Sequence, residues 1–338
     1  MKNCFLLAVA IATLAASSVR AKNLQDAAKD ASAPKPLPHA IVIKVDTDVK
    51  LEVLDWGGSG RPVILLSGLG DTANIFDTFA PKLTATCHVY GITRRGFGRS
   101  SVPAPSAENY SADRLGDDVL AVIDALKLNR PVLIGHSIAG EELSSVGSRH
   151  PEKVAGLIYL EAAYAYAYYD RSQGDLLIDA LALRKKLDEF IPGKGPQDQK
   201  QLIGELLQTD LPQFERELQE QEKALQSLPA RAQPPEELPL ADQAILEGQE
   251  KFTNIPVPVL AIFAVPHGGL AESFKDDPAG FAAAEAKDVA YVEAQAKALE
   301  NGVASIRVVR LPNADHYVFQ SNEGDVIREI NAFLASLP

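Results

Sequence analysis

The sequence predicts an α/β fold: a mostly parallel sheet wrapped by helices, with an inserted helical cap. Short apolar runs alternate with amphipathic segments along most of the 338-residue chain, the pattern of a parallel sheet covered on both faces. Some runs, such as residues 63–66, are continuously apolar, as strands buried on both faces are. The alternation stops at about residue 164 and resumes at about residue 255.

The core is predicted over residues 39–163 and 255–338. Alternating residues at 41–45 and 51–54 predict a leading hairpin. The remaining apolar runs predict strands at 63–66, 89–92, 132–134, 157–160, 259–263 and 306–311. Apolar residues at helical spacing predict helices at 73–83 and 111–128 and a last helix that includes 326–334.

Residues 164–254 are predicted to form the helical cap. They are rich in Leu, Gln, Glu, Lys and Ala, with proline-rich punctuation at 228–239 and no convincing strand. The segment follows the carboxyl end of a strand, where ligands bind in open α/β sheets. We therefore expect it to face the active site, although an ordinary helical decoration is the alternative.

The N-terminus has the features of an export signal. Lys2 precedes the apolar run 4–16, and Val19-Arg20-Ala21 offers a small-residue cleavage site. The run is too short to span a bilayer. We expect residues 1–21 to be a signal peptide, 22–38 a flexible leader, and the protein to be exported (periplasmic or secreted), without membrane insertion once the signal is removed.

Composition narrows the classes of partner. The net charge of −12 disfavours nucleic acids and anionic membranes, so we expect a small-molecule substrate. Only Cys87 remains after the signal, so no intramolecular disulfide is expected. Cys/His spacings typical of zinc sites are absent, and we expect no metal and no cofactor. The oligomeric state cannot be deduced from these features.

Ser137 is the candidate nucleophile. Residues 132–140 read Val-Leu-Ile-Gly-His-Ser-Ile-Ala-Gly, a strand entering a crowded turn before a helix, which is the context of a nucleophile elbow. The helix N-terminus would favour developing negative charge. Ala139 stands where the pattern usually has glycine, and Gly140 follows it. A small residue at an ordinary strand–helix junction is the alternative.

His316 is the candidate general base. It lies in a loop between the last predicted strand and the last helix, and such loops converge above the sheet. We expect His136, beside the nucleophile, to point elsewhere. The histidines interpreted as structural or surface residues are His39, His88 and His150.

An oxyanion hole is predicted from the amides of Leu69 and Ile138. Ser67-Gly68-Leu69-Gly70 follows a strand, and its glycines allow the backbone to turn and present amides. An ordinary β-to-α turn is the alternative use of this sequence.

Taken together, these motifs resemble the α/β-hydrolase superfamily over about residues 40–338. The resemblance rests on Ser-Gly-Leu-Gly (67–70), Thr-Arg-Arg-Gly-Phe-Gly-Arg-Ser (93–100), Gly-His-Ser-Ile-Ala-Gly (135–140) and the His316 loop. It implies the α/β-hydrolase fold, a cap over the site, and the chain order nucleophile, acid, histidine. In the family the 93–100 segment is usually structural, with Arg95 and the glycines shaping a loop.

Glu161 is the candidate acid. The family most often places the acid after the strand at 259–263, where this chain has no nearby carboxylate. A minority uses the end of the strand after the elbow helix, which here ends at Glu161. Burying that carboxylate is costly without a cation, and the imidazole of His316 would supply one. Asp276 or Asp277 is the fallback, and a strand-end capping role for Glu161 is the alternative.

Four tyrosines follow at once: Tyr164, Tyr166, Tyr168 and Tyr169. They are expected either to line a pocket for an aromatic or acyl group or to pack the cap against the core.

The resemblance implies a serine hydrolase, carboxylesterase-like, that cleaves a small ester through an acyl-enzyme. It also allows a lactonase, an aminopeptidase, a carbon–carbon hydrolase or a cofactor-free haloperoxidase, and fold alone cannot choose among them. A serine nucleophile argues against haloalkane dehalogenases and epoxide hydrolases, which use aspartate there. Acyl transfer to an alcohol and a non-catalytic binding protein on the same fold are further alternatives.

Overall fold

The computed structural model describes residues 38–191, 195, 198–226, 237–268 and 278–338. The predicted signal peptide, all but the last residue of the predicted leader, and both fallback acids, Asp276 and Asp277, lie outside these residues. In the described part of the chain, no helix combines the length and apolar character needed to cross a membrane.

The described residues form an eight-stranded sheet in the order β1-β2-β4-β3-β5-β6-β7-β8. β1 pairs antiparallel with β2, and β2 antiparallel with β4, while the other neighbouring pairs are parallel. The predicted α/β fold with a leading hairpin is thereby confirmed. The strands are β1 (His39–Lys44), β2 (Lys50–Gly58), β3 (Arg61–Leu66), β4 (Cys87–Thr93), β5 (Val132–His136), β6 (Gly156–Leu160), β7 (Val259–Ala264) and β8 (Ile306–Leu311).

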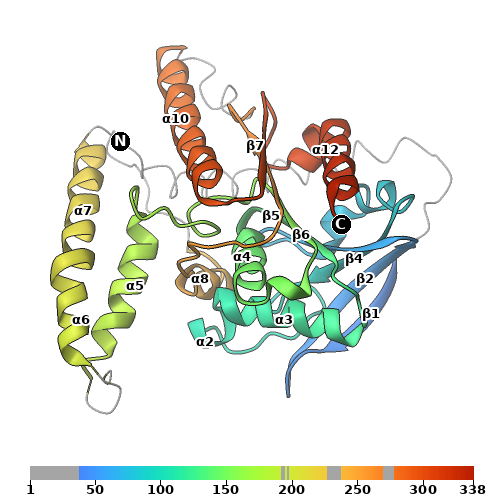
Figure 1. Ribbon diagram of the computed structural model, residues 1–338, viewed down its shortest axis with the longest axis horizontal. Helices are drawn as coiled ribbons and strands as arrows, with labels where there is room; N and C mark the ends of the chain where they lie inside the picture. Colours follow the sequence, from blue (N-terminus) through green and yellow to red (C-terminus); the bar gives the residue numbers. More distant parts are fainter. Residues whose placement is uncertain (1–37, 192–194, 196–197, 227–236, 269–277) are drawn as a thin grey trace.

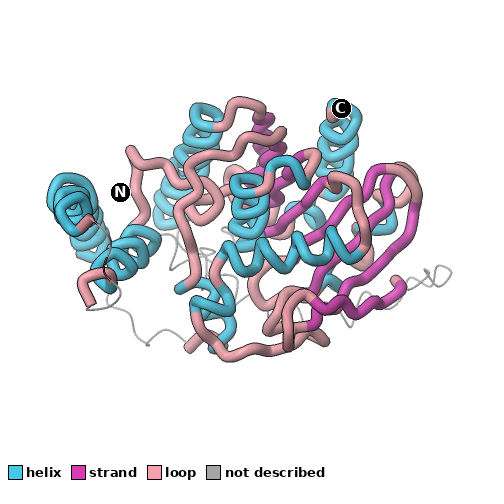
Figure 2. Tube along the Cα trace, turned by 60° about the horizontal axis from the view of Figure 1, so that its bottom comes forward, coloured by secondary structure: helices cyan, strands magenta, loops and turns pink. Residues whose placement is uncertain are grey.

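Helices cover both faces of this sheet (Figures 1 and 2). One apolar cluster joins the sheet to α3 (Ala112–Ala125), α4 (Gly140–Arg149) and α10 (Pro278–Gly302). The short helix α2 (Ala107–Tyr110) adds Tyr110 to that cluster. A second cluster on the other face joins it to α11 (Val318–Ser321) and α12 (Glu323–Ser336). β5 and β6 are buried throughout, as strands between two apolar layers must be.

The predicted helix at 73–83 is wrong. The segment instead forms two 3₁₀ turns, Ala73–Phe76 and Ala80–Lys82, and a third such turn, Pro151–Lys153, follows α4. Pro81 has no N–H and its ring clashes with the preceding turn, which opposes a continuous helix here. Phe76 and Phe79 are nonetheless fully buried, so the apolar spacing reflects packing rather than α-helix.

Between β6 and β7 lies a set of helices that we call the helical insertion. Figure 1 shows α5, α6 and α7 set apart from the sheet, with α8 close to α2. The helices of the insertion are α5 (Leu176–Asp188), α6 (Gln199–Glu205), a π-helical turn (Leu206–Asp210), α7 (Leu211–Gln226) and α8 (Leu240–Glu247). The domain boundaries and the role of the insertion as a cap stay predictions.

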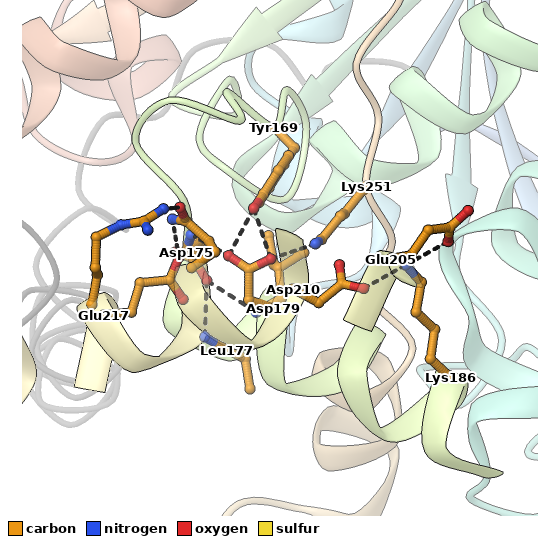
Figure 3. Close-up of polar contacts among 12 residues, drawn as sticks. Tyr169, Asp175, Leu177, Asp179, Lys186, Glu205, Asp210, Glu217 and Lys251 are labelled. Atoms are coloured by element: carbon orange, nitrogen blue, oxygen red, sulfur yellow. Dashed lines mark hydrogen bonds and ion pairs between the residues drawn. The ribbon is translucent and has the colours of Figure 1, made fainter. Parts of the chain in front are cut away.

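A buried polar network around Asp179 of α5 ties this insertion together (Figure 3). The Tyr169 hydroxyl lies 2.7 Å from both Asp179 carboxylate oxygens. Lys251 forms an ion pair with the same carboxylate. Glu217 of α7 also hydrogen-bonds to Asp179. The network therefore links α5, α7 and the segment after α8.

Candidate active site

Ser137 stands in a strained backbone conformation at the carboxyl end of β5. Its φ of +54° is in the left-handed region, which non-glycine residues adopt only when the surrounding structure imposes it. A short 3₁₀ turn, Ser137–Ala139, leads directly into α4. Strand, strained serine and helix together form the geometry of a nucleophile elbow.

The small residues of the elbow are explained by the limited space around it. Ala139 is fully buried and is tolerated where the usual pattern has glycine. Gly140 is the restricted position, because a Cβ there would lie 1.9 Å from the carbonyl oxygen of Ala162. A Cβ on Gly68 would lie 3.2 Å from the Cβ of Ser137, so the loop after β3 rests against the candidate nucleophile.

A buried arginine holds that loop in place. Arg94 pairs with Glu142 of α4, and its guanidinium donates to the carbonyl oxygens of Ser67 at 2.9 Å and Gly68 at 3.3 Å. Sequence reasoning missed this residue, although it lies within the 93–100 segment. The oxyanion roles of the Leu69 and Ile138 amides stay predictions.

Glu161 and His316 come together at the same edge of the sheet. Glu161 follows β6 directly, has a φ of +51° and is fully buried. Its Oε2 lies 3.5 Å from Nδ1 of His316, longer than a typical N–H···O hydrogen bond. His316 lies in the loop between β8 and α11.

His136 does not point away from this group, contrary to the expectation from its position on the elbow. Its Nε2 lies 3.0 Å from the carbonyl oxygen of His316, and the two rings have centroids 4.8 Å apart. The strand before the nucleophile therefore helps to hold the His316 loop.

Glu161 has further close partners. Its Oε1 accepts a hydrogen bond from the backbone N–H of Ala264 at 2.6 Å, and its Oε2 accepts one from the Tyr164 hydroxyl at 2.8 Å. The same Oε2 lies 2.7 Å from Nε2 of His267. Burial acts to raise the pKa of Glu161, but the charges and hydrogen bonds of the two histidines outweigh it and hold the pKa well below its usual range. Glu161 is therefore ionised.

His267 is the residue that sequence reasoning missed as part of the site. Its Nδ1 lies 2.9 Å from Oδ1 of Asp288, and its backbone N–H donates to Oδ2 of Asp288, also at 2.9 Å. Burial lowers the pKa of His267, yet the carboxylates of Glu161 and Asp288 raise it to about 10. His267 follows β7, where the resemblance usually places the acid, and that position was its signal in the sequence.

Glu161, His267 and His316 also have the spacing of a metal site, with ligand atoms within 4.8 Å of one another. Both ring nitrogens of His267 face carboxylates, however, so each nitrogen carries a proton and donates it. A protonated nitrogen has no lone pair for a metal ion. The contacts among these side chains are therefore better explained as a hydrogen-bond network.

The tyrosines after Glu161 divide into two pairs. Tyr164 stacks on Tyr291 with centroids 5.7 Å apart, and the Tyr166 hydroxyl hydrogen-bonds to the side chain of Ser137. Burial raises the pKa of Tyr166, so this hydroxyl stays protonated. Tyr168 and Tyr169 are also buried: Tyr169 binds Asp179 of the insertion, whereas the Tyr168 hydroxyl lies against Gly302 at the end of α10. The first pair contacts the candidate catalytic residues, and Tyr169 packs the insertion.

Comparisons with known proteins place the chain in a family. Residues 61–262 match the model of the alpha/beta hydrolase fold. A protein named "Putative carbamate hydrolase RutD" from Caulobacter segnis is 34% identical over 32% of this chain and 40% of its own length. A "Serine hydrolase-like protein" from Danio rerio is 34% identical over 31% of this chain and 32% of its own. The chain thus spans less than half the length of these relatives.

A likeness to solved structures extends further along the chain. A thermophilic esterase from Thermogutta terrifontis superposes with a TM-score of 0.53 and 17% identity, covering 88% of this chain and 98% of the esterase. At that identity the likeness shows the fold alone. Family match, sheet order and strained elbow agree, and the chain belongs to the α/β-hydrolase fold family.

Proposed function

We propose that the protein is a serine hydrolase that cleaves a small ester through an acyl-enzyme intermediate. The observation that carries the proposal is that Ser137 follows β5, Glu161 follows β6 and His316 lies in the loop after β8, all at the carboxyl edge of the sheet, with Glu161 3.5 Å from His316. Ser137 has the strained φ of an elbow, and Glu161 lies beside His316 with a lowered pKa. This pattern matches the roles of nucleophile, acid and base.

In the proposed reaction, His316 removes the proton of Ser137 as its oxygen attacks the ester carbonyl. The amides of Leu69 and Ile138 stabilise the oxyanion. His316 then returns the proton to the leaving alcohol, and an acyl group remains on Ser137. Water, deprotonated by His316, attacks this acyl-enzyme, and His316 passes that proton to the departing Ser137 oxygen as the acid is released. Glu161 orients the imidazole and stabilises its charged form.

A fluorophosphonate probe tests the proposal, because it reacts with activated serines. We expect the wild-type protein to be labelled and Ser137→Ala not to be. Absence of labelling in folded wild-type protein, together with unchanged behaviour of Ser137→Ala, would support the non-catalytic alternative and overturn the proposal.

A substrate panel defines the reaction subtype. We expect p-nitrophenyl esters of short acyl chains to be hydrolysed faster than lactones or aminoacyl amides. Faster turnover of the lactones or amides would replace the ester assignment within the same chemistry. Product ratios with and without an added alcohol separate hydrolysis from acyl transfer.

We also propose that the protein is exported. The support is the sequence of residues 1–21, with a charged start, an apolar run and a small-residue cleavage site. N-terminal sequencing of the mature protein should begin at Lys22, and an intact Met1 in the cytoplasmic fraction would contradict export.

A further inference from the structure

His267 connects two buried carboxylates that belong to different parts of the fold. Glu161 follows β6, whereas Asp288 lies within α10. Both carboxylates are almost fully shielded from solvent, with exposed fractions of 0% and 1%. The ring contacts them at 2.7 Å and 2.9 Å, and the backbone N–H of His267 adds a second contact to Asp288. The ring is therefore fixed on both sides.

The same ring competes with His316 for one oxygen. Nε2 of His267 lies 2.7 Å from Oε2 of Glu161, and Nδ1 of His316 lies 3.5 Å from that oxygen. A charge-assisted hydrogen bond of 2.7 Å is short and strong, so His267 is the tighter partner. The position of Oε2, and hence its attraction for His316, depends on His267.

The charges around His267 come from several elements. Glu161 after β6 and Asp288 of α10 contact it directly, and Tyr164 and His316 reach it through Glu161. Tyr291 of α10 feels the charge of Glu161, and Asp315 lies close to Gly268, where a Cβ would come within 2.8 Å of its Oδ1. The described side chains that contact the ring directly are the carboxylates of Glu161 and Asp288. Their negative charges explain why the ring stays protonated.

We propose that the Asp288–His267 pair is a positioning unit for the proposed catalytic acid: it fixes Oε2 of Glu161 and moderates the attraction of Glu161 for His316. This inference rests on the proposed function. His267 does not touch the reacting atoms in this scheme and acts only through Glu161. Asp288 holds the ring in the orientation that serves Glu161.

The pH profile of hydrolysis tests this role. In His267→Gln the positive charge beside Glu161 is lost, so the protonated form of His316 becomes more stable. The acidic limb of kcat/KM should therefore move to higher pH. We expect kcat to fall about 10- to 100-fold, by analogy with residues that orient metal ligands, while KM for a p-nitrophenyl ester stays nearly unchanged.

His88→Gln is the matched control. His88 also contacts a carboxylate, with Nε2 2.8 Å from Oδ1 of Asp55, but it lies on β4 at the opposite end from the candidate site. The pH profile of hydrolysis by His88→Gln should equal that of the wild type. An unchanged acidic limb and kcat in His267→Gln would overturn the proposal, as would an equal shift in both variants.

Two further measurements keep the test decisive. If His267→Gln does not fold, ¹⁵N spectra of wild-type histidine rings carry the test: one ring should keep both nitrogens protonated above pH 8, and neutral rings throughout would overturn the proposal.

Fluorophosphonate labelling separates failure of the proposed function from failure of this inference. Unlabelled wild type refutes the proposed function, whereas labelled wild type with an unaffected His267→Gln refutes only this inference.

Discussion

The molecule buries acidic clusters in two regions, and they handle charge differently. Around Glu161, the imidazolium of His267 separates two carboxylates. Around Asp179, whose surroundings Figure 3 shows, the second acid, Glu217, hydrogen-bonds to the first directly. Each network also includes a tyrosine hydroxyl that donates to the central carboxylate, Tyr164 in one and Tyr169 in the other.

The consequence lies in which groups titrate near neutral pH. Burial and the neighbouring Asp179 raise the pKa of Glu217 to about 8, whereas the pKa of Asp179 is lowered because hydrogen bonds, Lys251 among their donors, outweigh burial. Two acids in contact share one proton. In the Glu161 network the cation removes that need, so its carboxylate stays charged across the neutral range. A catalytic acid must stay charged, as Glu161 does in its network. The carboxylates around Asp179, which only hold helices together, have no such requirement.

The largest expected effect comes from removing the charge of Glu161. Glu161→Gln keeps the size of the side chain but no longer favours the correct tautomer of His316. We expect kcat to fall by about 10³- to 10⁴-fold. Steady-state kinetics on a p-nitrophenyl ester measures it. Asp276→Asn and Asp277→Asn are the controls, and near-normal turnover of Glu161→Gln would return the acid role to one of them.

The buried ion pair between Arg94 and Glu142 is a third way in which this fold holds a buried carboxylate. Glu142→Gln would leave the guanidinium of Arg94 without its partner in a site where the side chains are about 4% exposed. Removing one member of such a pair costs about 3–5 kcal/mol of unfolding free energy. Urea unfolding measures the loss. A change below about 1 kcal/mol would show that the pair contributes little to the hold on the Ser67 loop.

The pH dependence of the helical insertion follows from Glu217. Its pKa is raised above the unfolded value of 4.5, so the folded state keeps a proton that the unfolded state releases. This contribution to stability is fully present below about pH 4.5 and is lost as pH rises through about 8. Asp179 acts in the opposite sense, because its lowered pKa contributes stability that is lost as pH falls through the folded value.

Glu217→Gln sharpens that prediction. Glutamine has no carboxyl proton to lose in this pH range. The melting temperature of the variant should therefore decline less between pH 6 and pH 9 than that of the wild type. Limited proteolysis of the α5–α7 segment at both pH values reports the same change locally. Parallel declines in the two proteins would assign the pH dependence to other groups.

The smallest effect is expected at Glu141, next to Glu142. Neither carboxylate oxygen of Glu141 has a hydrogen-bond partner among the described residues, and the side chain is fully buried. Burial, then the charge of Glu142, raises its pKa well above the usual range. It is therefore neutral, and Glu141→Gln should change urea stability by less than about 1 kcal/mol. A loss comparable to that of Glu142→Gln would indicate an ionised Glu141.

The sequence predicted the strands and the elbow better than the supporting contacts. Runs and alternation of apolar residues identify strands from the local sequence alone. The predicted strand at 306–311 therefore coincides with β8, and the one predicted at 259–263 falls within β7. The turns at 73–83 share the apolar spacing of a helix, and only Pro81 argued against one. The prediction of Glu161 as the partner of His316 came from the α/β-hydrolase resemblance, which allows an acid at the end of the strand after the elbow helix. The Asp288–His267 contact depends on where α10 crosses the sheet, which no local pattern encodes.

Gly140 has a consequence for identifying relatives from sequence alone. Its missing side chain lets the start of α4 approach the carbonyl of Ala162, the residue after Glu161. The segment carrying the nucleophile and the segment carrying the proposed acid thus share one contact that admits no methyl group. The structure accommodates alanine at position 139, whereas a Cβ at position 140 would lie 1.9 Å from the carbonyl oxygen of Ala162. A search pattern written as Gly-x-Ser-x-small-Gly would retain chains that the stricter form discards.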